Sequence, residues 1–166
     1  MTGEDEIGPE LEGMVRRHGG QLAAIVGRML GDPGRADDVC QDTWLALWRN
    51  RARLELEGRD PWPLIRRVGV RKALDETRRR RRGPAALEAP EGIPAPVIGA
   101  SEGGETAGLL WGLADRERAC LVLYFWEGLS VREIAEILEC PEGSVKTWMH
   151  RGRRRLRERI EGGGDR

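Results

Sequence analysis

The chain has 166 residues, enough for one ordinary domain or two small ones, and its formal net charge is zero, so total charge does not identify a partner. It contains neither an apolar run long enough to span a membrane nor a signal peptide, so we expect a soluble cytoplasmic protein. Its three cysteines and two histidines lack the spacing of metal ligands, so we expect reduced thiols, no metal site and no cofactor.

Charge is strongly segregated along the chain. Residues 62–82 contain nine basic side chains and two acidic ones. Residues 143–159 contain seven basic side chains and one acidic one. Residues 1–12 and 83–108 contain acidic side chains and no basic ones. Two basic segments separated by acidic ones predict two surfaces that contact a polyanion, although two solvated helix faces would give the same pattern.

The first part of the chain reads as helical. Apolar residues recur at helical steps, and the segment 31–34, "GDPG", has the composition of a turn. Asp60 followed by Pro61 is typical of a helix start, with a capping side chain and then a proline. Three helices are expected here, over residues 10–30, 36–49 and about 60–82.

A linker follows these helices. Residues 81–106 are rich in proline, glycine and alanine and show no sustained periodicity. Such a segment is too long for a loop inside a compact domain. We therefore predict an N-terminal unit at residues 8–82, a flexible linker at 83–104, and a C-terminal unit at 105–161.

The second unit also reads as helical. Leucines near residues 109–113 begin a short helix, and Asp115 is expected to cap the helix that follows it. Gly128 should close that helix in the left-handed conformation. Ser130 with Glu133 has the spacing of a capping box for a helix over residues 131–138. Pro141 and Gly143 are expected to form the next turn, with the last helix starting at Ser144 or the residues just before it. No segment alternates with the period of a strand, so the predicted fold class is all-α.

The last two helices form a predicted helix-turn-helix. Val131, Ile134, Ala135 and Leu138 give one apolar stripe, and Val145 and Met149 give the matching one. In this motif the second helix enters the major groove and its N-terminal residues contact base edges. The residues so placed are Ser144, Lys146, Thr147, Trp148, His150 and Arg151. Arginines that include Arg153 and Arg154 follow where phosphates would lie. An ordinary helical hairpin with a basic face is the alternative interpretation.

These residues carry a family resemblance. The segment "LADRERACLVLYFWEGLSVREIAEILECPEGSVKTWMHRGRRRLRERI" resembles the fourth conserved region of bacterial RNA polymerase sigma factors. The segments "GDPGRADDVCQDTWLALW" and "LIRRVGVRKALDETRRRRR" resemble parts of the second conserved region. The resemblance covers most of the chain in the family's order. It is strongest to the small extracytoplasmic-function branch, which keeps only these two regions and a linker.

The resemblance implies a function for each segment. The last helix would read the minus-35 promoter element. The third helix would read and open the minus-10 element through Arg66, Arg67, Arg71, Lys72, Asp75, Arg78 and Arg79. The second helix would bind the beta-prime coiled coil of core RNA polymerase through Asp38, Gln41, Asp42, Trp44 and Trp48. From the helix alone, the two tryptophans could equally be core residues and the acids a solvated face. The family also implies contact with the beta flap and a loop near residues 51–60 that captures a flipped base.

Regulation by an anti-sigma factor is a further implication of the resemblance. We also expect the two units to pack only weakly against each other in the free chain. The sequence departs from the family pattern at Arg71, where asparagine is usual, at Val70, where a polar residue is common, and at Trp148, where arginine is frequent. The family's tryptophan near position 64 is replaced by Trp62.

Two other functions are compatible with parts of the pattern. A stand-alone regulator that binds duplex DNA as a dimer would use the same helix-turn-helix, but the N-terminal unit lacks the βα alternation of a receiver domain. A metal-dependent nuclease could use Asp37, Asp38 and Asp42, but the sequence offers neither a supporting histidine nor a second carboxylate cluster. We therefore predict a sigma factor and not an enzyme.

Overall fold

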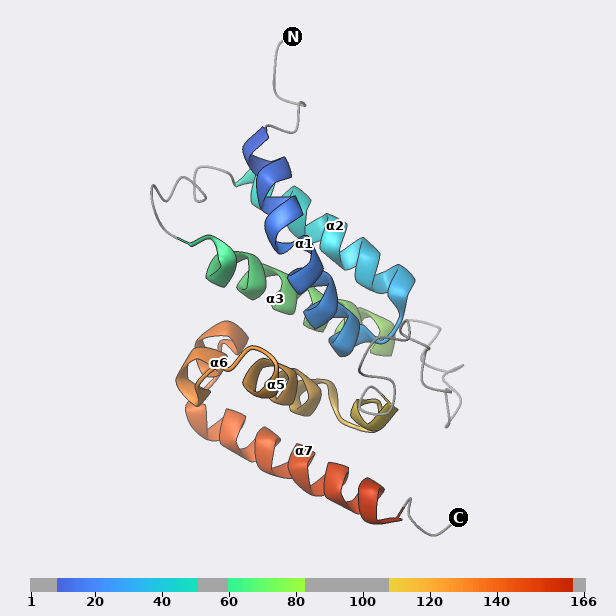
Figure 1. Cartoon of the computed structure of the whole chain (residues 1–166). Helices are drawn as coiled ribbons and strands as arrows, with labels where there is room; N and C mark the ends of the chain where they lie inside the picture. Colours follow the sequence, from blue (N-terminus) through green and yellow to red (C-terminus); the bar gives the residue numbers. More distant parts are fainter. Residues whose placement is uncertain (1–8, 51–59, 83–107, 163–166) are drawn as a thin grey trace.

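A computed structural model of the chain describes residues 9–50, 60–82 and 108–162 (Figure 1). The all-α prediction is confirmed, since these residues form helices and no strand. The helices are α1 (Pro9–Leu30), α2 (Pro33–Arg49), α3 (Trp62–Arg82), α5 (Asp115–Phe125), α6 (Val131–Leu138) and α7 (Glu142–Gly162). The predicted linker at 83–104 and the base-capture loop near 51–59 lie outside the described residues.

Helices α1, α2 and α3 pack around a shared apolar core. Leu22 and Ile25 of α1 and Ile65 of α3 are almost completely buried. Gly69 of α3 lies so close to α1 that a Cβ atom there would overlap the Leu22 Cδ1 methyl group. The glycine therefore sets how closely the two helices approach each other.

The starts of α2 and α3 follow their capping residues. The Asp32 carboxylate accepts a hydrogen bond from the Arg35 backbone N–H at 3.2 Å, and Pro33 occupies the first turn. This cap starts α2 three residues before the predicted residue 36. The Asp60 carboxylate accepts a hydrogen bond from the Trp62 N–H at 3.0 Å, but α3 begins at Trp62, so Pro61 precedes the helix and is not its first residue as predicted.

The C-terminal helices form a second packed group, in which α5 lies between α3 and α7 (Figure 1). The predicted capping box of α6 is confirmed: Glu133 accepts from the Ser130 N–H at 2.8 Å, and Ser130 Oγ accepts from the Glu133 N–H at 3.3 Å. The hydrogen bonds from Ser130 hold the pKa of Glu133 below its ordinary value. Gly128 has the predicted left-handed conformation, with φ of 64°.

One predicted helix cap and one predicted turn in this group are corrected. Ala114, not Asp115, is the N-cap of α5, and its N–H is satisfied by the Glu117 carboxylate at 3.2 Å. Helix α7 begins at Glu142, just before Ser144 as predicted, but Gly143 is helical and does not form the turn. The chain reverses instead at Glu139, whose φ of 51° is left-handed.

The two groups of helices pack against each other. Helix α5 contacts α1 and α3, α6 contacts α3, and one continuous apolar cluster includes residues of both groups. Gly31, at φ of 65°, lies against Trp111, and a Cβ atom at this glycine would overlap the indole ring. The structure therefore differs from the expected weak packing. The contacts are dispersed over several helices and have no periodic signature in the sequence.

The three cysteines are free thiols, and burial controls their ionisation. Burial, aided by the charge of Asp37, raises the pKa of Cys40 from 9.0 to about 11. Burial raises the pKa of Cys120 from 9.0 to about 12 and also raises that of Cys140. Cys120 is completely buried, whereas Cys40 and Cys140 are half-buried.

Thiol labelling is expected to follow this order. Because the thiolate is the reactive form, we expect Ellman's reagent at pH 8 to modify Cys140 first and Cys120 only on global unfolding. The raised pKa values of Cys40 and Cys120 stabilise the fold below about pH 9, and this contribution is lost as the pH rises towards 11 to 12. Rapid labelling of Cys120 in the native protein would contradict the packing of α5.

Candidate nucleic-acid interface and polymerase-docking surface

Helix α3 carries the first basic surface. Its apolar residues, among them Ile65, Val70 and Leu74, are buried against the rest of the molecule. Arg67, Asp75, Arg78 and Arg79 are exposed, as the sequence predicts for residues that meet DNA. Lys72 is half-buried.

Two of the predicted minus-10 residues are instead engaged by the second group of helices. The Arg66 guanidinium lies 3.3 Å from the Glu127 carboxylate, and the two side chains are only 11% and 13% exposed. Arg71 lies 2.9 Å from the Glu139 carboxylate and donates a hydrogen bond to the Ile137 carbonyl at 3.0 Å. These two arginines thus bind protein groups in the structure.

Helices α6 and α7 form the predicted helix-turn-helix. Ile134 and Ala135 of α6 are buried together with Val145 and Met149 of α7, so both apolar stripes face inward as predicted. Gly152 extends the inward face of α7, and a Cβ atom there would lie 2.9 Å from Leu121 Cδ1. Helix α7 is thereby held with its opposite face towards solvent.

The predicted minus-35 residues divide into two groups on α7. Exposed side chains belong to Lys146, Thr147, His150, Arg151, Arg153 and Arg154, whereas Ser144 and Trp148 are half-buried. The Trp148 ring packs against the core, and the Arg116 guanidinium lies over it, 5.4 Å from its centroid. Trp148 therefore faces the neighbouring helices more than the predicted groove-reading surface.

Sequence reasoning missed an aromatic cluster beside α7. Tyr124, Phe125 and Trp126 are all exposed at the end of α5. The Arg153 guanidinium lies 5.4 Å from the Tyr124 ring and 5.5 Å from the Phe125 ring. Arg28 of α1 lies 5.2 Å from the Trp126 ring. The only sequence signal for this cluster was the run of three aromatic residues next to Gly128.

Two buried charged residues of α5 were also missed. Glu117 is 3% exposed and forms an ion pair with Arg155 of α7 at 2.8 Å. Arg118 is 6% exposed and lies 3.0 Å from Asp115. Burial lowers the pKa of Arg118, although Asp115 opposes this shift. The Glu117–Arg155 pair joins α7 to α5, whereas the Asp115–Arg118 pair lies within α5.

Arginines gather where α3 approaches the second group of helices. A cavity of about 370 Å³ is lined by residues of α3, α5 and α7. Five of these residues are arginines and two are acidic: Arg78, Arg81, Arg116, Arg151, Arg155, Asp115 and Glu117. Arg81 forms an ion pair with Asp115 at 3.0 Å across this boundary.

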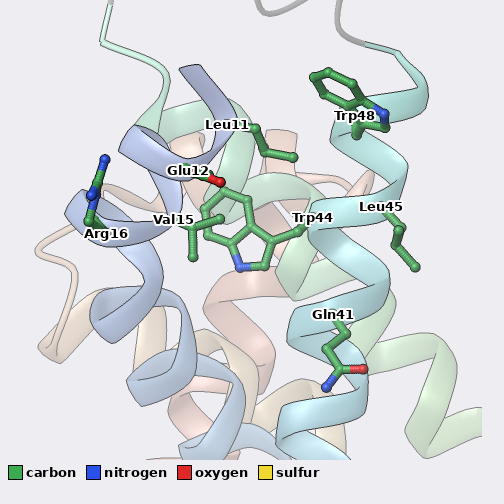
Figure 2. Close-up of a pocket in the computed structure, with 8 residues that line it drawn as sticks. All are labelled: Leu11, Glu12, Val15, Arg16, Gln41, Trp44, Leu45 and Trp48. Atoms are coloured by element: carbon green, nitrogen blue, oxygen red, sulfur yellow. The ribbon is translucent and has the colours of Figure 1, made fainter. Parts of the chain in front are cut away.

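Helices α1 and α2 form a groove between them. The groove has a volume of about 530 Å³ and apolar walls that include Leu11, Val15 and Leu45. Figure 2 shows the Trp44 indole extending from α2 towards Glu12 and Val15 of α1. Gln41, Trp44 and Trp48 of the predicted polymerase-binding set line this groove.

The remaining acidic residues of that set are exposed. Asp38 and Asp42 stand one turn apart on α2, and neither lines the groove. The inward face of α2 is formed by other residues, among them Val39 and Leu47. The predicted set therefore combines an apolar groove with exposed carboxylates on one helix.

The described residues contain no group of three or more histidine, cysteine, aspartate or glutamate side chains that could hold a metal ion. Among the helices that the structure describes, none is long and apolar enough to cross a membrane.

Comparisons with known proteins agree with this arrangement. Residues 14–83 match the family described as Sigma-70 region 2, and residues 109–156 match Sigma-70, region 4. Together the two matches cover more than half of the chain. Helices α2 and α3 lie within the first matched stretch, and α6 with α7 up to residue 156 lies within the second.

Individual relatives point to the same family. The chain is 29% identical over 154 residues to the ECF RNA polymerase sigma factor SigK of Mycolicibacterium vanbaalenii, which covers 83% of this chain and 75% of that protein.

Solved structures share the fold. The sigma factor RpoE in complex with the anti-sigma factor NepR, from Bartonella quintana, superimposes with a TM-score of 0.70 at 20% identity, covering 95% of this chain and 99% of that one. CnrH in complex with the cytosolic domain of CnrY gives a TM-score of 0.64 at 26% identity, covering 92% and 88%. With its two matched regions, its helix-turn-helix and this fold, the chain belongs to the extracytoplasmic-function branch of the sigma-70 family, whose members direct transcription initiation.

Proposed function

We propose that this sigma factor reads the minus-35 element with the outward face of α7. The observation that carries the proposal is a pair of basic helix surfaces, one in each matched region, of which α7 presents its basic face to solvent. Arginine forks match guanine edges and phosphates in geometry and charge. The proposed residues are Ser144, Lys146, Thr147, Trp148, His150, Arg151, Arg153 and Arg154. Thr147, His150, Arg151 and Arg154 lie on the face opposite the buried stripe, so they carry most of the reading.

Helix α3 is the proposed minus-10 reader. Its basic residues would bind backbone phosphates and hold the strand that opens at this element. The set consists of Arg66, Arg67, Arg71, Lys72, Asp75, Arg78 and Arg79.

The groove between α1 and α2 is the proposed contact for core RNA polymerase. An apolar groove flanked by carboxylates suits an amphipathic helix that carries basic residues. Asp38, Gln41, Asp42, Trp44 and Trp48 are the proposed contacts for the beta-prime coiled coil. The beta flap would bind the second unit.

An anti-sigma factor is the proposed regulatory partner. One solved structure named above contains the sigma factor RpoE bound to the anti-sigma factor NepR, and the other contains CnrH bound to the cytosolic domain of CnrY. We also propose that the protein is cytoplasmic and acts as an initiation factor without catalysis. The proposed units are residues 8–82 and 105–161, joined by a linker at 83–104.

Co-elution with bacterial core RNA polymerase on a sizing column tests this function. Wild type is expected to co-elute stoichiometrically, and the variant Asp38→Arg/Gln41→Ala to lose co-elution, because α2 then presents a repelling charge and a shortened groove wall. Glu161→Arg is the control, since it makes the same change of charge at an exposed position of α7.

The outcomes separate two functions. If the double variant loses co-elution and the Glu161→Arg control keeps it, the result supports the polymerase contact on α2. If wild type fails to co-elute but binds duplex DNA tightly and with strong salt dependence by itself, the chain acts as a stand-alone regulator.

A further inference from the structure

The first observation is that Arg71 of α3 caps α6 from outside the helix-turn-helix. Its Nε donates to the Ile137 carbonyl at 3.0 Å, and its terminal nitrogen lies 3.4 Å from the Glu136 carbonyl and 2.9 Å from the Glu139 carboxylate. The last carbonyls of a helix lack partners within the helix, and the helix end carries partial negative charge. A guanidinium fork therefore suits this site in both geometry and charge.

The second observation is the conformation of Glu139. It is the only residue other than glycine with positive φ among the described residues. A side chain with a Cβ atom is disfavoured there, and such outliers concentrate at functional positions. The Cys140 N–H donates to the Ala135 carbonyl at 3.1 Å, so the chain reverses at Glu139 and its carboxylate meets Arg71.

A second pair lies near the other end of the same contact. Arg66 and Glu127 lie 3.3 Å apart, and both side chains are nearly buried. Arg66 Nε is buried without a hydrogen-bond partner in the part of the chain that the structure describes. A buried network that is only partly satisfied is weaker than a complete one. The pair therefore holds the two groups of helices together, but the Arg66 Nε–H remains able to donate a hydrogen bond to another acceptor.

We propose that these residues form a latch that blocks promoter reading by α3 in the free chain. The latch consists of Arg66 and Arg71 on α3, and of Glu127, Glu139 and the final carbonyls of α6. This inference rests on the proposed function, because Arg66 and Arg71 are residues that α3 would offer to the minus-10 element. A guanidinium that binds Glu127 or the end of α6 is not available to DNA.

The latch lowers the fraction of molecules whose α3 is able to bind DNA. If only the open arrangement presents Arg66 and Arg71, the measured affinity for DNA falls by the open fraction. Around the 370 Å³ cavity Arg81 pairs with Asp115 and Arg155 with Glu117, and the positive charge that remains on the other three arginines opposes the closed arrangement. A polyanion, or a partner that pulls the helix-turn-helix away, would therefore shift the balance to the open form.

The acidic side of the latch is the side to alter, because the proposed DNA contacts then remain intact. The test variant is Glu127→Gln/Glu139→Gln. The matched control is Glu136→Gln/Glu161→Gln, which changes net charge equally but removes exposed carboxylates outside the latch, and no ion pair joins either of them to a proposed DNA contact among the described residues.

A second variant separates latching from folding. Glu139→Gly removes the carboxylate and relieves the left-handed strain. It is expected to keep or raise the melting temperature while still weakening the latch. A merely structural role for Glu139 would instead leave DNA affinity unchanged.

Two measurements on the full chain decide the proposal. Small-angle scattering should give a larger radius of gyration for the latch variant than for wild type and control. Binding of a fluorescein-labelled, mixed-sequence, single-stranded 20-mer should become about tenfold tighter in the latch variant and stay within about twofold in the control.

The proposal would be overturned if the latch variant and the control bound the 20-mer with equal affinity. It would also be overturned if wild type had the same radius of gyration as the latch variant. Scattering requires neither polymerase nor DNA, so it tests the latch even if the co-elution experiment fails.

Discussion

Replacing Leu22 with alanine is expected to lower the free energy of unfolding by about 3 kcal/mol. The Leu22 side chain is fully buried between α1 and α3, and its Cδ1 methyl fills the space left by the missing side chain of Gly69. The loss combines the transfer energy of the removed methyl groups with the cavity that remains. Guanidinium denaturation followed by circular dichroism measures it. Leu45→Ala is the control, because Leu45 is 47% exposed and the same change there should cost below about 1 kcal/mol.

Gly69→Ala supplies a second arm of the same experiment. In wild type the new methyl group overlaps Leu22, and such overpacking costs about 1 to 3 kcal/mol. In the Leu22→Ala background the space is free, and alanine then gains about 1 kcal/mol of helix propensity over glycine. The substitution should therefore change sign between the two backgrounds. Additive effects would refute direct packing of Gly69 on Leu22.

The second large effect is expected on DNA binding by α7. With the sigma factor assembled on core polymerase, Arg151→Ala/Arg154→Ala should weaken binding about 100-fold to a duplex that wild type selects from a random library. Each lost arginine contact contributes about 1 to 3 kcal/mol. Removing two phosphate-neutralising charges should also reduce the slope of log affinity against log salt by about 2. Filter binding over a salt series gives both quantities.

Arg157→Ala/Arg159→Ala is the matched control for this pair. It removes the same charge from the same helix, but beyond the turns proposed to enter the groove. Affinity should fall much less in this control. If both variants weaken binding equally, α7 contributes general charge and does not read sequence.

Local chemistry explains which parts of the fold were predictable. The capping box of Ser130 and Glu133 and the left-handed Gly128 depend on residues next to each other, and both were predicted correctly. The cap of α5 was missed because Ala114 has no side-chain acceptor, and Glu117 supplies the bond from within the helix. The reversal at Glu139 was missed because glycine and proline nearby gave a stronger turn signal.

The sequence predicted which helices form the candidate site, but it predicted less well which groups surround the individual side chains. The buried stripes of α6 and α7 follow from the helical period, which leaves His150 and Arg154 outward. Trp148 and Arg66 also lie on predicted helices, but their surroundings come from residues distant in the sequence: Arg116 for Trp148 and Glu127 for Arg66. Such contacts depend on how helices distant in the sequence pack together, within one group for Trp148 and between the two groups for Arg66, and the periodicity of a single sequence does not encode this.

The contact of Gly31 with Trp111 makes these two positions epistatic. Any larger residue at 31 has an unfavourable backbone angle and also overlaps the indole ring. Replacing Trp111 with a small residue removes the overlap but leaves the unfavourable backbone angle. A variant at 31 would thus separate the two halves of the molecule without altering a single charged group. A substitution at 31 would favour the open arrangement independently of every residue proposed to contact DNA or polymerase.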